Sequence, residues 1–280
     1  MDDKSFKELA AALTHTARSA GELVLRYRGQ SADVTLKEDG SPVTHADQVA
    51  EELILNDLSR IAPGIAVVAE ESVAVLPDGF DPNQPFFLVD PLDGTKDFIR
   101  GGKEFTVNIA LVKNRQPVFG LVYAPALEVL YVTLSAAEAV CARLAPARSE
   151  PLETLADLKP LRTREPDLTK LKALVSRSHR TDKTDRYMER LPITETVQLG
   201  SSLKFAVLAD GGADIYPRLE PTFEWDTAAG HAILNAAGGV ALTMDGQPLL
   251  YGKRETNLLN PAFVALGRHS CVAELPLAQV

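Results

Sequence analysis

The chain has 280 residues, of which 45% are hydrophobic and 24% charged, a composition typical of a globular protein. Its net charge of −9 argues against a nucleic acid polymer as partner, because phosphate backbones select basic protein surfaces. Its two cysteines, Cys141 and Cys271, have neither CxxC spacing nor histidine-rich surroundings, which argues against a zinc site or a disulfide framework.

The N-terminal segment differs from a signal peptide, since it opens with acidic residues and is interrupted by charges every few positions. No stretch approaches the roughly eighteen apolar residues of a membrane span. The cysteine usage fits a reducing compartment. We therefore expect a cytoplasmic protein. The sequence leaves open whether it associates loosely with the cytoplasmic face of the inner membrane, and whether it is a monomer or a homodimer.

Two helices are predicted in the first 60 residues. The segment 6–27 has apolar residues at helical spacing, namely Leu9, Leu13, Ala17, Ala20, Val24 and Tyr27. A turn-rich segment, KEDGSPVTHAD, follows it. A second amphipathic helix is expected over 44–58, where Thr44 and Asp47 have the spacing of a capping box.

Short apolar runs then predict strands. IAVVAEES and FFLVD favour buried strands that end in carboxylates, and a loop rich in proline, glycine and aspartate separates them. Three further runs are rich in β-branched and aromatic residues and predict antiparallel strands: FTVNIALV, PVFGLVYA and LEVLYVTL.

The polar, proline-interrupted stretch 145–168 predicts a junction between two domains, 1–155 and 156–280. Beyond it, apolar runs of strand type alternate with helical patterns as far as VALT at 240–243. Such alternation is typical of an α/β domain. We therefore expect an α/β protein with an α+β N-terminal half and an α/β C-terminal half.

The strongest chemical signal is the hexapeptide DPLDGT that begins at Asp90. Asp90 and Asp93 flank a proline-stiffened turn, so one strand end can present both carboxylates and the Leu92 carbonyl to adjoining cations; Mg²⁺ prefers such oxygen ligands. Gly94 lets the backbone approach a phosphate, and Thr95 can begin a helix whose amides favour anions. By itself, the hexapeptide is also typical of ordinary turns.

Other acids could join this motif. Glu70 and Glu71 end the preceding strand. Consecutive side chains of a strand point to opposite faces, so only one of the two should reach the site, and we expect it to be Glu70. The alternative is a solvated strand end. Asp226 precedes a helix of small residues, as an N-cap or as a ligand facing a cation. Capping alone explains the spacing of Asp47 from Thr44. Its functional alternative is a partner for Thr95 or for a further metal-bound water.

Basic and hydroxyl groups in three later segments are candidates for phosphate contacts. They are His179 in SRSH, Ser201 and Lys204 in GSSLK, and Arg218 in YPR. Lysine binds phosphate as a point charge and arginine as a bidentate fork. Each is also compatible with a solvated charge or a helix cap. His231, inside a helical pattern, is expected to be a satisfied, partly buried histidine.

Together these motifs resemble the inositol monophosphatase superfamily. That superfamily is marked by a Glu-Glu pair, then DP(L/I)DGT, then Trp-Asp followed by small residues, and all three occur here in that order. Within it, the chain is most similar to the bacterial 3'(2'),5'-bisphosphate nucleotidases. The segments that carry this similarity are SPVTHAD, LVDPLDGTKDF, EFTVNIALV, GLVYAPALEVLY, SRSH, GSSLKF, IYPR, WDTAAGHA and LNPAF.

The resemblance implies a layered α/β/α/β/α sandwich and a phosphoric monoester hydrolase that uses two or three Mg²⁺ ions. The implied reaction removes the 3'-phosphate from adenosine 3',5'-bisphosphate, and from its sulfated relative, by in-line attack of an activated water. The implied role is clearance of this by-product of sulfate activation, with lithium as an inhibitor. The alternatives are an inositol or sugar monophosphatase and a non-catalytic nucleotide or ion sensor on the same scaffold.

The resemblance also implies residue roles. The metal ligands would be Glu70, Asp90, the Leu92 carbonyl, Asp93 and Asp226. The catalytic group that orients the water would comprise Asp47, Thr95 and Glu70. The substrate contacts would be Gly94, Thr95, His179, Ser201, Lys204, Arg218 and Asp226. The chain departs from the pattern at Asp97, where a longer acid is common, and over 136–174, which leaves the pocket rim less well defined than the metal site.

Overall fold

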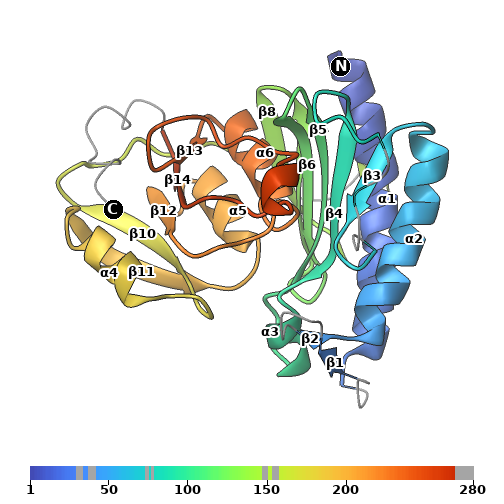
Figure 1. The fold of residues 1–280 in the computed structure, drawn as a ribbon, viewed down its shortest axis with the longest axis horizontal. Coiled ribbons are helices and arrows are strands. Elements are labelled where there is room, and N and C mark those ends of the chain that lie inside the picture. Colours follow the sequence, from blue (N-terminus) through green and yellow to red (C-terminus); the bar gives the residue numbers. More distant parts are fainter. Residues whose placement is uncertain are drawn as a thin grey trace.

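The computed structural model of the protein describes residues 1–29, 34–36, 42–72, 76, 79–146, 151–152 and 158–268. Residues 37–41 of the turn-rich segment, parts of the predicted domain junction, and Cys271 lie outside these ranges. The described elements form five layers: two helices, a seven-stranded sheet, two helices, a five-stranded sheet and one helix (Figure 1). This is the expected α/β/α/β/α sandwich.

The outer layer next to the seven-stranded sheet consists of α1 (Asp3–Tyr27) and α2 (His45–Ile61), both predicted from helical spacing. Asp2 caps α1 by accepting a hydrogen bond from the Ser5 amide. The predicted capping box of α2 is present, with Thr44 at the cap position. Both helices bury their apolar faces on one side of the larger sheet (Figure 1).

The larger sheet has the strand order β3-β4-β5-β6-β7-β8-β9. The pair β3–β4 is parallel and all other neighbours are antiparallel. The strands run over Ala66–Ala69, Phe86–Asp93, Thr106–Lys113, Gln116–Ala124, Val129–Ser135, Glu138–Arg143 and Lys159–Pro160. The first five strands were predicted, whereas β8 and β9 were not, because their sequences lack a β-branched or aromatic run.

The smaller sheet has the order β11-β10-β12-β14-β13. Its strands are β10 (Leu171–Ser176), β11 (Ile193–Leu199), β12 (Ile215–Arg218), β13 (Val240–Thr243) and β14 (Phe263–Leu266). Its helices are α4 (Asp182–Met188), α5 (Leu203–Ala209) and α6 (Ala228–Ala236). All of these were predicted except β14. The predicted boundary at 155/156 remains a prediction.

Helices α5 and α6 fill the layer between the two sheets (Figure 1). Small residues make this layer thin. A Cβ atom at Gly120 in β6 would lie 2.0 Å from the Ala229 carbonyl oxygen, and one at Gly230 would lie 2.5 Å from Phe205 Cβ. The small residues after Asp226 thus bring α6 directly against the larger sheet. Short elements complete the fold: β1 (Thr35–Leu36), β2 (Pro42–Val43), α3 (Thr95–Ile99) and the 3₁₀ turn Arg254–Thr256.

Across the described part of the chain, no helix combines the length and apolar character needed to cross a membrane.

Candidate active site

Acidic residues from three separate segments converge at the end of strand β4. Glu70 directly follows β3, Asp90 lies in β4, and Asp226 precedes α6. Because β3 and β4 are parallel neighbours, their carboxyl ends lie at the same edge of the sheet. Carboxylate oxygens of these three residues lie within 4.8 Å of one another. Glu70 therefore lies close to the other two acids, as expected.

The DPLDGT turn is built on a break in the β4–β5 ladder. The register shifts between Asp90 and Asp93, where a proline, which has no amide hydrogen to donate, is tolerated. The Leu92 amide donates to Asp90 Oδ1 at 3.0 Å, and the Thr95 hydroxyl lies 3.1 Å from the Leu92 carbonyl oxygen. Gly94 has a φ of +94° and precedes α3, as expected of a glycine before a helix start.

Asp93 does not belong to the group of three and points toward α5. Its Oδ2 lies 2.9 Å from the hydroxyl of Ser202, which also lies 2.6 Å from the Asp226 carbonyl oxygen. The buried Asn108 side chain in β5 donates to the same hydroxyl at 2.8 Å. Ser202 thus connects two predicted ligands, although the sequence motif drew attention to Ser201 instead.

Asp226 does not cap α6, so the structure excludes the N-cap alternative for this residue. The cap position belongs to Thr227. The Asp226 carboxylate instead accepts hydrogen bonds from the Thr222 hydroxyl and, at 3.0 Å, the Phe223 amide. The preceding turn supplies these two donors, and this leaves the carboxylate beside Glu70 and Asp90.

The clustered acids are electrostatically unfavourable without a cation. Burial, with repulsion from Glu70, Asp93 and Asp226, holds the pKa of Asp90 well above its usual range. Desolvation and the Asp93 charge raise the pKa of Asp226 to about 6. Asp90 Oδ2 is buried and has no hydrogen-bond partner among the described residues. A set of carboxylate and carbonyl oxygens with one unpaired buried oxygen fits a hard divalent cation.

Asp47 and Thr95 lie in contact, as expected if Asp47 is a partner for Thr95. Thr95 Oγ1 lies 3.2 Å from Asp47 Oδ1, while Asp47 Oδ2 accepts from the Thr44 amide at 2.8 Å. Asp47 therefore caps α2 with one oxygen and contacts Thr95 with the other. Burial raises the pKa of Asp47 to about 6, against the opposing effect of the Thr44 hydrogen bonds.

Two of the predicted basic contacts, Lys204 and Arg218, interact electrostatically with the acids. Lys204 is buried; its Nζ donates to the Ser201 carbonyl oxygen at 2.5 Å and lies 5.4 Å from the centre of the Tyr216 ring. Burial lowers the pKa of Lys204 to about 8, and the Asp93 charge opposes this effect. The guanidinium of Arg218, also buried, donates to the Glu220 and Pro221 carbonyl oxygens at 3.1 and 2.9 Å.

His179 and Ser201 complete the predicted set. His179 is exposed, and its pKa is lowered by partial desolvation and by the charges of Arg218, Lys96 and Lys204. These electrostatic interactions make His179 a neighbour of the other two basic contacts. Ser201 has a φ of +48°, and its buried hydroxyl has no hydrogen-bond partner within the described ranges.

A polar link that the sequence did not suggest joins the two halves beside this region. Glu104 accepts from the Gly200 amide at 2.6 Å and pairs with Arg177 at 2.7 Å. Asp97 accepts from the Glu104 amide at 2.8 Å and lies 3.5 Å from Arg177. The shorter acid at Asp97 is therefore used in this link, which holds the GSSLK segment against the DPLDGT loop.

Comparison with known proteins agrees with this geometry. The model of the inositol monophosphatase family matches residues 5–270. The 3'(2'),5'-bisphosphate nucleotidase CysQ of Shigella flexneri is 42% identical over 254 residues, covering 88% of this chain and 95% of the relative. The protein of the same name from Escherichia coli strain K12 is 41% identical over 254 residues, with the same coverage.

A solved structure shows the same similarity in three dimensions. The crystal structure of CysQ from Bacteroides thetaiotaomicron, a bacterial member of the inositol monophosphatase family, matches with a TM-score of 0.76 at 33% identity. The match covers 94% of this chain and 99% of that chain. The chain belongs to the inositol monophosphatase family.

Proposed function

We propose that the protein is a Mg²⁺-dependent 3'(2'),5'-bisphosphate nucleotidase, which removes the 3'-phosphate from adenosine 3',5'-bisphosphate to give AMP and phosphate. The observation that carries the proposal is the meeting of Glu70, Asp90 and Asp226 within 4.8 Å. The names of the relatives at 41–42% identity support the nucleotide substrate. The phosphosulfated relative of this nucleotide is a second candidate substrate.

Two or three Mg²⁺ ions would be held by the acids and by one backbone oxygen: Glu70, Asp90, the Leu92 carbonyl, Asp93 and Asp226. When bound, such ions lower the pKa of a coordinated water and offset the charge of the phosphate oxygens. Asp90 Oδ2, which is buried and unpaired among the described residues, supplies a ligand atom with no competing role.

Asp47 and Thr95 would orient the attacking water, together with Glu70. The Thr95 hydroxyl has two acceptors within 3.2 Å, Asp47 Oδ1 and the Leu92 carbonyl oxygen, so its hydrogen points to one of them. Its lone pairs are then free to accept a hydrogen bond from water. Asp47 stays in place because Thr44 holds its other oxygen. Water attacks directly in this proposal, and no phosphoenzyme forms.

The basic region would bind the nucleotide and its phosphates through Lys204, Arg218 and His179, with Ser201. Gly94 and Thr95 would contact the scissile phosphate from the DPLDGT side. The buried Lys204 and Arg218 supply two positive charges that interact with the acids, which suits a substrate with a second phosphate. An inositol or sugar monophosphate has no second phosphate to pair with these two charges. Activity on such a monophosphate is therefore the second candidate function.

The cellular role proposed is clearance of adenosine 3',5'-bisphosphate formed during sulfate activation, in the cytoplasm or at the cytoplasmic face of the inner membrane. The protein would act as a monomer or homodimer, and lithium would inhibit it by competing for a magnesium position. The partner is a small nucleotide, and the net charge of −9 argues against a nucleic acid polymer in its place.

Parallel phosphate-release assays test the proposal. Adenosine 3',5'-bisphosphate and inositol 1-phosphate are each incubated with the protein, with and without Mg²⁺. We expect Mg²⁺-dependent release from the nucleotide and much slower release from the inositol phosphate. Faster release from inositol 1-phosphate would favour the second candidate. Tight nucleotide binding without turnover would instead indicate a sensor.

A further inference from the structure

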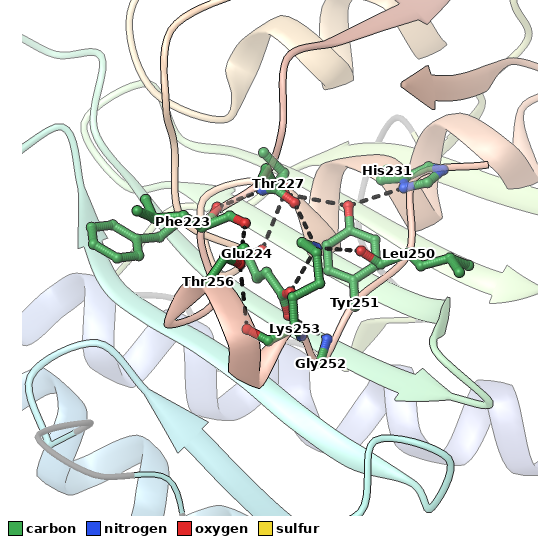
Figure 2. Close-up of polar contacts among 11 residues, drawn as sticks. Phe223, Glu224, Thr227, His231, Leu250, Tyr251, Gly252, Lys253 and Thr256 are labelled. Atoms are coloured by element: carbon green, nitrogen blue, oxygen red, sulfur yellow. Dashed lines mark hydrogen bonds and ion pairs between the residues drawn. The ribbon is translucent and has the colours of Figure 1, made fainter. Parts of the chain in front are cut away.

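A buried ion pair includes the residue two positions before Asp226 of the acidic site. Glu224, two residues before Asp226, has no exposed surface, and Lys253 is 9% exposed. Lys253 Nζ lies 2.6 Å from Glu224 Oε1. Figure 2 shows the two side chains pointing toward each other between the segment that leads into α6 and the loop that contains Lys253.

Both members of the pair have further partners. The Glu224 carboxylate accepts hydrogen bonds from the backbone amides of Gly252 at 2.5 Å and Lys253 at 2.9 Å. The Lys253 ammonium also donates to the Leu250 carbonyl oxygen and, at 3.1 Å, to Asn260 Oδ1. Buried ion pairs are weak evidence for stability, because desolvation offsets their attraction. A satisfied pair at this location points to a geometrical role.

The surrounding backbone is fixed by the same loop. The Glu224 amide donates to the Leu258 carbonyl oxygen at 2.9 Å, and the Asn260 amide donates to the Thr222 carbonyl oxygen at 2.9 Å. The Asn260 side chain donates to the Phe223 carbonyl oxygen and to the Thr227 hydroxyl, each at 3.0 Å. The segment 222–227 is therefore held on both sides of Glu224.

This segment contains both groups that orient the Asp226 carboxylate. The donors to that carboxylate are the Thr222 hydroxyl and the Phe223 amide. On the C-terminal side, the Glu224 carbonyl oxygen accepts from the Thr227 and Ala228 amides at 3.2 and 2.9 Å. Any shift of Glu224 would therefore move both the donors to Asp226 and the start of α6.

We propose that Glu224 and Lys253 are positioning residues, which fix the Asp226 carboxylate in the geometry needed to share a cation with Glu70 and Asp90. This inference rests on the proposed function, since it concerns the same cation site. Neither residue is assigned a contact with substrate or with the reacting atoms. Their effect passes through the backbone of 222–227.

The main test is the double variant Glu224→Gln/Lys253→Met, which removes both charges and leaves neither unpaired. Mg²⁺ dissociation constants are measured by calorimetry at 20 °C, and melting temperatures by circular dichroism. Loss of groups that orient metal ligands typically weakens metal binding about 10–100-fold. We expect a loss in this range in a protein that is still folded at 20 °C. The single variant Glu224→Gln is the second variant. Its one amide oxygen replaces only one of the two carboxylate oxygens that accept from the loop amides, and it leaves the Lys253 charge without its counter-ion. We therefore expect it to lose Mg²⁺ affinity in the same range, with a larger fall in melting temperature than in the double variant.

The matched control is Arg164→Met. Arg164 pairs with Asp214, another buried carboxylate, which keeps a hydrogen bond from the Lys172 amide at 2.7 Å. This variant removes the guanidinium that pairs with a buried acid, at a place away from Asp226. Its melting temperature should therefore fall, while its affinity for Mg²⁺ should equal that of the unaltered protein. Wild-type Mg²⁺ affinity in both Glu224 variants would overturn the inference and leave the proposed function standing. Failure of the unaltered protein to bind Mg²⁺ would overturn both.

Discussion

The hydroxyl of Ser202 lies 2.9 Å from the Asp93 carboxylate, although 109 positions separate the two residues in the chain. The same hydroxyl lies 2.6 Å from the Asp226 carbonyl oxygen. Asn108 donates to it from the larger sheet, so its single hydrogen is directed to one of these two acceptors. Ser202 thus ties the two halves of the fold together at the acidic site.

Ser202→Ala should weaken the site without unfolding the protein. The change removes the link between Asp93 and Asp226. We therefore expect the affinity for Mg²⁺, or the rate of turnover, to fall about 10–100-fold. Ser201→Ala is the matched variant one position away; it should raise KM for the nucleotide and leave Mg²⁺ affinity unchanged. Equal effects of the two variants on Mg²⁺ affinity would remove Ser202 from this role.

Asp93→Asn should abolish turnover in a protein that still folds. The amide keeps a partner for Ser202 but loses the negative charge that the proposed cation requires. Phosphate release from adenosine 3',5'-bisphosphate measures the loss, and circular dichroism measures the fold. Near-normal activity would exclude Asp93 from the site.

Thr95→Ala should lower kcat with little change in KM, because it removes the hydroxyl proposed to orient the water. The expected loss is about 10²-fold, the usual cost when a reacting group is misplaced by about 1 Å. Thr95→Ser keeps the hydroxyl and should retain most of the activity. Equal losses in the two variants would show that the Thr95 methyl group, and not its hydroxyl, is needed.

The stabilisation by Mg²⁺ should depend on pH. The Asp226 pKa of about 6 in the folded protein exceeds its ordinary value of 3.8, so the folded form binds more protons than the unfolded chain between these values. Acidification through pH 6 therefore raises the free energy of unfolding of the metal-free protein, by up to about 1.4 kcal/mol per pH unit for one group. Asp47, with a pKa raised to about 6, acts in the same direction.

Protons and Mg²⁺ compete for the same carboxylates, so added Mg²⁺ should raise the melting temperature more at pH 8 than at pH 5. A difference of 1 kcal/mol corresponds to about 2–4 °C for a chain of this size class. Differential scanning fluorimetry at the two pH values measures the shift, with Asp93→Asn as the variant of reduced response. An equal shift at both pH values would contradict the assignment of the acids to a cation site.

Local patterns were sufficient to predict much of the fold. Helices α1 and α2 follow from apolar residues at helical spacing, and strands β3 to β7 from short runs that end in turns or acids. Strand β8, with the sequence EAVCAR, has no local strand signal and forms because it pairs with β7. Strand β14 likewise depends on pairing with β12 and β13.

Residues of the candidate site were predicted where they lie in one motif on one segment. They were missed where their position depends on contacts between distant segments. Asp90, Asp93 and Thr95 stand in one hexapeptide, and their proximity follows from the chain itself. Ser202 owes its position to a contact between the start of α5 and Asn108 in β5, which no local pattern encodes. For Asp226, the helical sequence after it left an N-cap open beside a ligand role, and only the folded turn shows that Thr222 and Phe223 donate to its carboxylate.

The central feature of the proposed site is a set of cations held by acids that are far apart in the sequence. Crystals grown with Mn²⁺ and phosphate, with diffraction measured at an energy where manganese scatters anomalously, test this directly. We predict anomalous peaks between the carboxylates of Glu70, Asp90 and Asp226, with a further peak near Asp93. Crystals that show ordered acids with no peak among them, or peaks only elsewhere on the surface, would contradict the account.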